Sequence, residues 1–507
     1  MSRSIPTTWQ TLLIALLVVA APLGAESAAP TAVTLASELA ALRQQLALQQ
    51  RQIEELRAAL DAQRLLLEQM LPVSQQLRSA PQAAAPLPNT PAPSELAQPT
   101  LNRFSAAGFL FSGDFRYRLD LQARSSNEFA GPLQNVRSRY RLRLNVDKQL
   151  DSRFKFHMQL STGPYNVGLT NDQDMGATVA KPPFSLAEAY IDFHPNSHFL
   201  LRGGRMEEVF ADNMRFLWDD DVRFNGFHQI FTLPIGDGPL GLRTIEFRAG
   251  EYILTNPNVS VLPANSPYVS AGYQPGQKVR AANLFHPGLI LKGSLDSAWN
   301  HQAVADVSLY RNPNQIQLAS TSAGYPAVVC NSLGLSLAGQ ITGAGNATTA
   351  PGGAMYTAPR FQIVRLAYRL ERNGLRVGNR EMPAWLDFQA ARNVGTSRLR
   401  DAVMASANLG AIRGAGDVRF LYQFAIKDAN SMISQFTDDD LGTGTGVNIA
   451  VHALRFDLGI TRFLQWQNLL FIQHARRADN SAERFFVLLP RGSNPTFRYL
   501  GQLAFSF

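Results

Sequence analysis

Cysteine, clustered histidines and long apolar runs are all scarce in this sequence, and each shortage excludes a class of protein. Cys330 is the single cysteine among 507 residues, so we expect no internal disulfide, no thiolate metal site and no catalytic thiol. The eight histidines are dispersed and show no metal-ligand spacing. No nucleophile elbow or phosphate-binding loop follows a predicted strand and opens a helix. We therefore expect a protein that is not an enzyme and that carries no cofactor and no metal.

The one long apolar run, Thr11–Ala20, follows Arg3 and precedes a group of small residues that ends near Ala25. A basic start, an apolar centre and a small-residue end are typical of a secretory signal, and the run is too short to remain as a membrane-spanning helix. We interpret residues 1–25 as a signal peptide that directs the chain out of the cytoplasm. The net charge is +8, but the basic residues form no continuous block in the sequence. We therefore do not expect nucleic acid as a partner.

Residues 34–71 carry an apolar heptad pattern with alternating spacings of four and three. The seam consists of Leu35, Leu39, Leu42, Leu46, Ile53, Leu56, Leu60, Leu67 and Met70. This pattern predicts an α-helical coiled coil, and its mainly leucine seam favours three helices over two. The alternative is a single amphipathic helix packed on a domain, but the register never slips. Residues 72–106 are rich in proline and alanine and predict an extended linker.

From residue 107 to residue 507 the hydrophobic period changes to two. In the segment 136–146, apolar residues such as Leu142 and Leu144 alternate with arginines, and 109–121 and 153–160 repeat the pattern. Such alternation places one face of a strand against an apolar medium and the other against water. The basic residues that share the polar face are Arg116, Arg118, Arg137, Arg139, Arg141, Arg143, Arg153 and Lys155. The last segment ends on Phe507, which is typical of bacterial outer-membrane proteins.

The connections between these segments fall into two lengths. Short turns are expected at 147–152, 194–197, 236–241 and 414–417, and longer polar stretches at 163–183, 206–221, 255–278, 312–359 and 431–446. Short turns at one rim and long loops at the other are the asymmetry of outer-membrane barrels. The sequence therefore predicts an all-β fold, a transmembrane antiparallel barrel of about 16 strands with 18 as the alternative. Such a barrel is wide enough to enclose an aqueous lumen.

Several stretches resemble a known family. The sequences GDFRYRLDLQ, VRSRYRLRLNVDKQLDSRFKFHMQLSTG and LAEAYIDFHP are similar to the proteobacterial outer-membrane family named putative porin, a relative of the phosphate-selective porins O and P. The resemblance covers most of residues 108–507 and implies a trimeric diffusion channel among outer-membrane lipid and lipopolysaccharide. The arginines and lysines that bind phosphate in those relatives have no residue-by-residue match here, so phosphate specificity is not implied.

The basic face needs acidic partners, because close like charges repel by up to about 1 kcal/mol per pair even in water. The segment 206–221, the third loop by strand order, offers Glu207, Glu208, Asp212, Asp219, Asp220 and Asp221. In general porins the third loop folds into the barrel and faces a basic wall. We therefore predict a constriction with these acids opposite the basic residues. The alternative places the acids at the rim, among divalent cations bound to lipopolysaccharide.

These features predict a passive outer-membrane channel for small hydrophilic or anionic solutes, with a modest anion preference set by the basic face. The N-terminal segment would lie in the periplasm, where its coiled coil would support a homotrimer. The alternative is a structural barrel whose coiled coil tethers the outer membrane to the cell wall. Autotransporters and TonB-type receptors fit poorly, since neither a large passenger nor a folded plug domain is recognisable before residue 107.

Overall fold

The computed structural model describes the C-terminal part of the chain. The described residues are 104–125, 133–163, 168–176, 182, 184–211, 214–236, 238–255, 280–316, 346–347, 355–442, 446–476 and 495–507. The predicted signal peptide, the predicted coiled coil, nearly all of the predicted linker and the loop residue Asp212 lie outside them.

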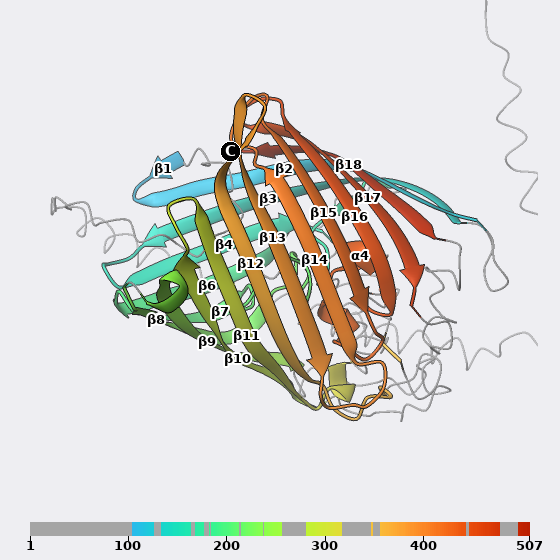
Figure 1. Cartoon of the computed structure of the whole chain (residues 1–507), viewed down its shortest axis with the longest axis horizontal. Helices are drawn as coiled ribbons and strands as arrows, with labels where there is room; N and C mark the ends of the chain where they lie inside the picture. The colour runs from blue at the N-terminus through green and yellow to red at the C-terminus, as the bar shows by residue number, and fades with distance from the viewer. Residues whose placement is uncertain are drawn as a thin grey trace, which may run out of the picture. The chain divides into compact units, whose positions relative to one another are not determined.

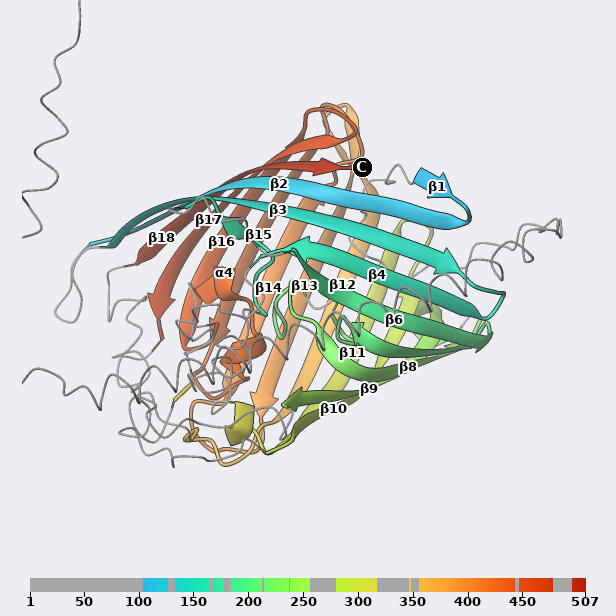
Figure 2. The same ribbon diagram turned by 180° about the vertical axis from the view of Figure 1, so that it is seen from behind.

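Antiparallel strands form a closed barrel, as the alternating pattern predicts (Figures 1 and 2). The strands are β2 (Phe109–Arg124), β3 (Leu133–Gln149), β4 (Phe154–Thr162), β6 (Phe184–Asn196), β7 (Phe199–Met206), β8 (Phe224–Pro234), β9 (Leu242–Thr255), β10 (Ala282–Ser294), β11 (Trp299–Arg311), β12 (Gln362–Val377), β13 (Arg380–Asn393), β14 (Asp401–Gly410), β15 (Val418–Lys427), β16 (Ile449–Gly459), β17 (Leu464–Ala475) and β18 (Thr496–Ser506). Each pairs with its neighbour in the chain, and β18 pairs with β2 to close the ring.

The barrel wall has 16 strands within the described residues. The continuous sheet counts 18 strands, but two of them are short and do not extend the wall. The first, β1 (Phe104–Ala106), forms a hairpin with the start of β2. The second, β5 (Gln173–Asp174), lies in the loop after β4 and pairs with β3. The prediction of 16 strands is therefore confirmed, and the alternative of 18 is wrong for the wall.

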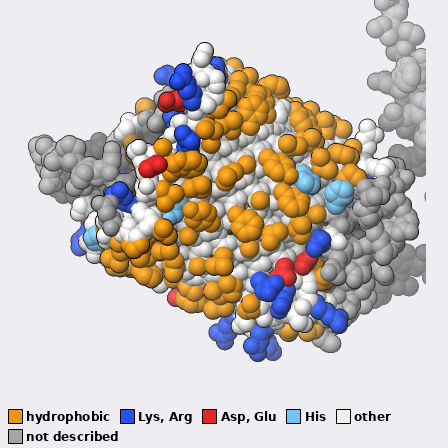
Figure 3. All heavy atoms as spheres, in the orientation of Figure 1, with side chains coloured by type: hydrophobic (Ala, Val, Ile, Leu, Met, Phe, Trp, Pro, Cys, Tyr) orange, Lys and Arg blue, Asp and Glu red, His pale blue; other side chains and the backbone are white. Residues whose placement is uncertain are grey.

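Alternation along each strand sorts apolar side chains outward and polar ones inward. On β2, Arg116 and Arg118 are buried, whereas Tyr117 between them is exposed on the outer surface. On β13 the outward Leu386 and Phe388 remain more than half exposed. Figure 3 shows such apolar side chains covering the outer face, with charged ones gathered toward its edges. An outer surface of this kind is suited to hydrocarbon, and an inward polar face to water.

Short and long connections alternate around the barrel. Residues 197–198 join β6 to β7 and residues 378–379 join β12 to β13, both at one rim. At the other rim the second loop (163–183) joins β4 to β6, the third loop (207–223) joins β7 to β8, and the seventh loop (428–448) joins β15 to β16. The predicted division into turns and loops is confirmed, including the position of the segment 206–221 as the third loop.

Helical elements are short. They are η1 (Pro239–Gly241) in a turn between strands, and η3 (Ser434–Phe436) and α4 (Asp439–Gly442) in the seventh loop. Among the described residues no helix is both long enough and apolar enough to cross a membrane. In Figure 2, α4 is seen within the ring of strands, and inward-facing Gln473 of β17 donates hydrogen bonds to the carbonyls of Asp440 and Leu441. The seventh loop therefore folds back onto the inner wall.

An apolar cluster fills part of the interior near the long loops. Phe216 and Trp218 of the third loop pack there with inward side chains such as Tyr252, Leu284 and Phe471. Burying large apolar side chains stabilises the contact of a loop with the wall by about 1.5–3 kcal/mol per residue. The polar interior predicted from sequence therefore fits β2, β3 and β4 better than the opposite wall, where the loops sit on an apolar surface.

Candidate functional site

The basic residues of β2 and β3 face the interior in adjacent rows. Arg116 lies opposite Arg141, and Arg118 lies opposite Arg139. Like charges in directly opposite positions of an antiparallel pair are destabilising. All four side chains are at most 8 % exposed, so water cannot screen this repulsion. The arrangement requires buried acids beside it.

One such acid is Asp172, in the second loop. Its carboxylate contacts Arg116 Nη2 at 2.6 Å, Arg118 Nη1 at 2.8 Å and Arg139 Nη1 at 3.6 Å, and its side chain is fully buried. Burial alone would raise the pKa of Asp172, but the surrounding guanidinium groups more than offset this effect and hold it well below its usual value. A single carboxylate from the second loop therefore neutralises the centre of the basic face.

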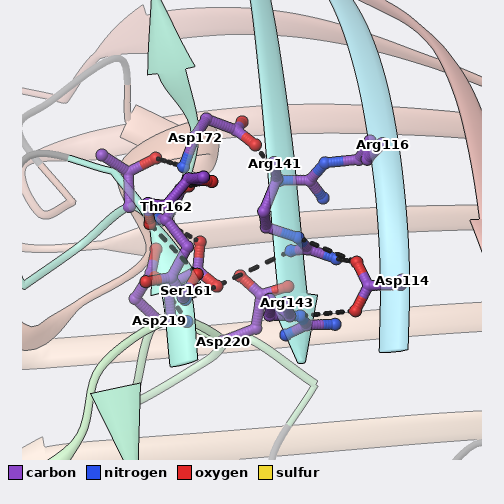
Figure 4. Close-up of polar contacts among 12 residues, drawn as sticks. Asp114, Arg116, Arg141, Arg143, Ser161, Thr162, Asp172, Asp219 and Asp220 are labelled. Atoms are coloured by element: carbon purple, nitrogen blue, oxygen red, sulfur yellow. Dashed lines mark hydrogen bonds and ion pairs between the residues drawn. The ribbon is translucent and has the colours of Figure 1, made fainter. Parts of the chain in front are cut away.

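Further acids come from β2 and β3 and from β5 in the second loop. Figure 4 shows Arg141 and Arg143 converging on Asp114 of β2, at 2.8 and 2.6 Å. The remaining pairs are Arg137 with Asp120 at 2.5 Å, Arg139 with Asp174 at 2.7 Å and Lys155 with Asp147 at 2.9 Å. Short distances of this kind are typical of charge-assisted hydrogen bonds.

Arg153 is the exception among the eight predicted residues. It was expected on the third strand, but β4 begins at Phe154, and Arg153 lies in the exposed turn that precedes it. Its backbone N–H donates to the side chain of Asp151, which caps the turn. The strand period was read one residue too early at this point, because the polar turn residue continues the alternation.

The third loop begins with a buried clamp on the opposite wall. Glu208 accepts from His286 Nδ1 at 2.6 Å, and Asp306 accepts from His286 Nε2 at 2.9 Å. Because both ring nitrogens face carboxylates, the imidazole is held with both protons, as an imidazolium. Arg365 completes the cluster by pairing with Asp306 at 2.6 Å, and Phe210 packs against the His286 ring at 4.6 Å between centroids. The loop is thereby fixed to β10, β11 and β12.

The third loop then reaches β15 and the seventh loop. Met214 and Arg215 both adopt left-handed backbone conformations, with φ of 57° and 66°, which is strained for residues with side chains. Their carbonyls accept hydrogen bonds from Gln423 and Lys427 of β15. The tertiary contacts with β15 therefore maintain a backbone shape that the local sequence would not choose.

The acids predicted for a constriction take different partners from those expected. Glu207 pairs with Arg223 at 3.1 Å, and Asp220 pairs with Arg215 at 2.7 Å, both within the loop itself. Asp221 lies 3.7 Å from Arg141 of the basic face, and Arg116 and Arg141 help to lower the pKa of Asp220. Asp221 also accepts two hydrogen bonds from Asn171 of the second loop, so it joins the two loops.

Sequence reasoning missed the main counter-charges. The sequence shows Asp172 and Asp440 only as members of the long polar stretches 163–183 and 431–446. In the structure Asp440 of the seventh loop lies 2.9 Å from Arg498 and 3.7 Å from Arg118. The available signal was the number of inward arginines, which demands nearby acids. That signal does not say which loop supplies them.

A cluster of carboxylates beside the basic face has the spacing of a metal site, but its neighbouring cations explain it as a set of ion pairs. Carboxylate oxygens of Asp219, Asp220 and Asp438 lie within 4.8 Å of one another. However, Arg215 Nε lies 3.1 Å from Asp438, and Lys427 adds a second positive charge from β15. We interpret this group as an ion-pair junction between the third and seventh loops. Within the described residues, the arrangement supports an electrostatic filter and contains no nucleophile with an adjacent base.

Comparison with known proteins identifies one protein family that matches part of the chain. Residues 111–268, less than half of the chain, match the sequence profile of a family described as "Putative porin". None of the curated proteins matches the chain.

Solved structures that resemble the chain include porins. OmpF of Salmonella typhi, in complex with daunomycin, has 8 % identity and a TM-score of 0.41, over 80 % of this chain and 100 % of that one. A mutant of the porin of Rh. blastica has 10 % identity and a TM-score of 0.36, and a triple mutant of the Rhodopseudomonas blastica porin has 9 % and 0.37. Each alignment covers 79 % of this chain and 100 % of the other. These TM-scores are too low to support an inference about this chain. The barrel architecture is therefore assigned from its own strand pairing.

Proposed function

We propose that this protein is an outer-membrane porin, a passive channel for small hydrophilic solutes. The observation that carries the proposal is a closed antiparallel barrel with an apolar outer face and an inward face of charged groups. A closed barrel satisfies every backbone hydrogen bond within the wall, which spanning a bilayer requires. The match of residues 111–268 to a porin family supports the same conclusion. Because the barrel is membrane-spanning, its surroundings are outer-membrane lipid and lipopolysaccharide.

The second, third and seventh loops form the proposed constriction. They meet over the basic face of β2 and β3 and carry Asp172, Asp221 and Asp440 against it. Loops held by buried ion pairs keep a fixed shape, so solutes would be sorted by size and charge at this level. The second observation in favour is the His286 clamp, which fixes the third loop to the opposite wall.

The pairing of charges in this geometry supports the modest anion preference predicted from the sequence. Seven of the eight predicted basic residues have an acidic partner within 4 Å, and the acids are seven in number. They are Asp114, Asp120, Asp147, Asp172, Asp174, Asp221 and Asp440. Fields from paired charges largely cancel beyond a few ångströms. We therefore propose a weakly selective channel in which anions retain a small advantage.

We also propose that three copies assemble. The support is the predicted coiled coil of residues 34–71, which lies outside the described residues and would sit in the periplasm. If residues 34–71 form a trimer, three barrels are brought together, and sedimentation of this segment measures its oligomeric state.

Planar-bilayer recording tests the channel. We expect the refolded barrel to conduct, with a small reversal potential of anionic sign in a salt gradient. In the variant carrying both Arg139→Ala and Arg141→Ala, Asp172 and Asp114 each lose one cationic partner, which should shift the reversal potential toward cations. A barrel that inserts without conducting would contradict the proposal and favour the tethering alternative. An unchanged reversal potential in the double variant would show that these side chains do not act on the conducting path.

A further inference from the structure

The third and seventh loops meet at a junction centred on Arg215. Its guanidinium contacts Asp220 of its own loop at 2.7 Å, and Asp438 and Asp440 of the seventh loop at 3.1 and 3.3 Å. Beside it, the backbone N–H of Asp219 donates to the carbonyl of Phe436 at 2.9 Å. These contacts join the tip of the third loop to the seventh loop.

Negative charge exceeds local positive charge at this junction. Asp219, Asp220, Asp438 and Asp440 contribute four carboxylates, whereas Arg215 and Lys427 face them with two cations. Asp440 obtains further compensation from Arg498 and Arg118. Asp438 is fully buried and Arg215 is its one ion-pair partner among the described contacts. The charge of Asp438 is therefore less compensated than that of Asp440, and its side chain is more deeply buried than that of Asp220.

The physical consequence is a carboxyl group that holds a proton unusually well. Burial raises the pKa of Asp438 to about 6, Asp440 and Asp220 act in the same direction, and Arg215 and Lys427 oppose it. For Asp440, burial is more than offset by Arg498, Arg118 and Arg215, so its pKa stays below the usual value. Arg215 likewise holds the pKa of Asp220, whose side chain is about half exposed, below its usual value. Among Asp220, Asp438 and Asp440, Asp438 is thus the carboxyl group whose pKa is raised toward neutrality.

We propose that this junction is a proton-sensitive latch, in which proton uptake by Asp438 tightens the contact between the third and seventh loops and narrows the channel. The inference rests on the proposed porin function and adds a form of regulation to it. The latch responds to the binding of a proton, and no other ligand is required.

The direction follows from linkage. A solvated aspartate, as in the unlatched loops, binds a proton near pH 3.9, about 2 units below the latched form. Whichever state binds the proton more tightly is favoured as the pH falls. Acid therefore shifts the ratio of latched to unlatched channels by up to on the order of 100-fold. Rising pH loosens the junction, because Asp438 becomes ionised beside the carboxylates of Asp220 and Asp440.

Trp218 provides an optical readout that does not depend on conduction. It is 5 % exposed and its ring lies 6.5 Å from that of Phe436 across the junction. Acrylamide quenching would be measured on the purified, refolded full chain from pH 4.5 to 7.5, with and without Trp218→Phe. The difference between the two proteins isolates Trp218 from the other tryptophans. We expect acrylamide quenching of the Trp218 fluorescence to increase several-fold as the pH is raised, with a midpoint near pH 6.

The decisive variant is Asp438→Asn, which keeps the side-chain shape and mimics the protonated form. Trp218 should then stay protected across the whole pH range. The matched control is Asp428→Asn in the same loop, whose partner Arg476 lies 3.4 Å away and outside the junction. The control should keep the wild-type transition. A wild type without a transition, or an Asp438→Asn variant that retains one, would overturn the latch.

Conductance completes the test and separates the two proposals. The wild-type channel should pass less current as the pH falls through 6, whereas Asp438→Asn should show low and pH-independent current. A quenching transition in a barrel that never conducts would refute the porin function while supporting the latch. A conducting barrel whose current and quenching are both flat between pH 4.5 and 7.5 would do the reverse.

Discussion

Replacing Asp172 by asparagine should reveal how strongly the second loop holds the basic face. The substitution removes one negative charge that lies within 4 Å of Arg116, Arg118 and Arg139, and it barely changes the side-chain shape. Arg118 keeps Asp440 at 3.7 Å and Arg139 keeps Asp174 at 2.7 Å. Among the described contacts, Arg116 retains no acidic partner.

The expected loss can be estimated from burial. Removing one partner of a buried ion pair costs about 3–5 kcal/mol, because the remaining charge stays desolvated. Asparagine still accepts a hydrogen bond from Arg116 and two of the three arginines keep another acid, so we expect about 3 kcal/mol. Asp174→Asn is the matched control, since Asp174 pairs with the same Arg139 but is half exposed. An exposed pair of this kind contributes about 0–1 kcal/mol.

Urea unfolding of the refolded barrels, followed by tryptophan fluorescence, measures both free energies of unfolding. The contribution of Asp172 to the free energy of unfolding should be complete above pH 4. A carboxyl whose folded pKa lies below its unfolded value stabilises above the unfolded value, and this stabilisation fades as the pH falls toward the folded one. The same variant should shift the reversal potential toward anions, because it leaves one uncompensated positive charge. Equal losses in the two variants would refute the idea that burial makes Asp172 the main counter-charge.

Three other predictions test separate parts of the molecule. Leu142→Arg puts a charge on the outer face and should cost about 2–4 kcal/mol, whereas Arg141→Leu should leave assembly intact; equal behaviour in an outer-membrane assembly assay would contradict the assigned faces. Residues 34–71 alone should sediment as a trimer, and a monomer at tens of micromolar would remove the argument for a trimeric barrel. Glu208→Gln should leave His286 with a single carboxylate partner and free the third loop, which single-channel recording would register as larger current fluctuations than in wild type.

The parts of the fold that could be predicted depend on short stretches of sequence. The inward position of Arg139 and the outward position of Leu142 follow from the period of the strand, which any few neighbouring residues reveal. The order of the loops follows from counting strands, so the segment 206–221 was assigned to the third loop, which spans residues 207–223 in the structure. Errors at strand ends, such as Arg153, arise because a polar turn residue can continue the pattern by one step.

The loop acids Asp172 and Asp440 could not be predicted as partners of the basic face, because the loops that carry them fold onto β2 and β3 only in the tertiary structure. Arg118 and Asp440 are separated by 322 positions (440 − 118) and meet only because the seventh loop folds back onto the wall. Nothing in the local run of three aspartates distinguishes Asp440 from solvated charge. The apolar inner surface was missed for a related reason. Alanine, methionine and valine on the inward face of β14 and β16 weaken the alternation, and this signal resembles a poorly defined strand.

The division of labour between wall and loops has a consequence for selectivity. The arginines of β2 and β3 are fixed by strand register, and moving one by a single position would turn it toward lipid. Their counter-charges Asp172, Asp221 and Asp440 instead lie on loops, where a substitution leaves the hydrogen bonds of the wall unchanged. The net charge at the constriction can therefore change through the loops alone, while the basic face stays constant. A barrel built in this way would vary in solute preference far more readily than in architecture, and that variation should be sought in residues 163–183, 207–223 and 428–448.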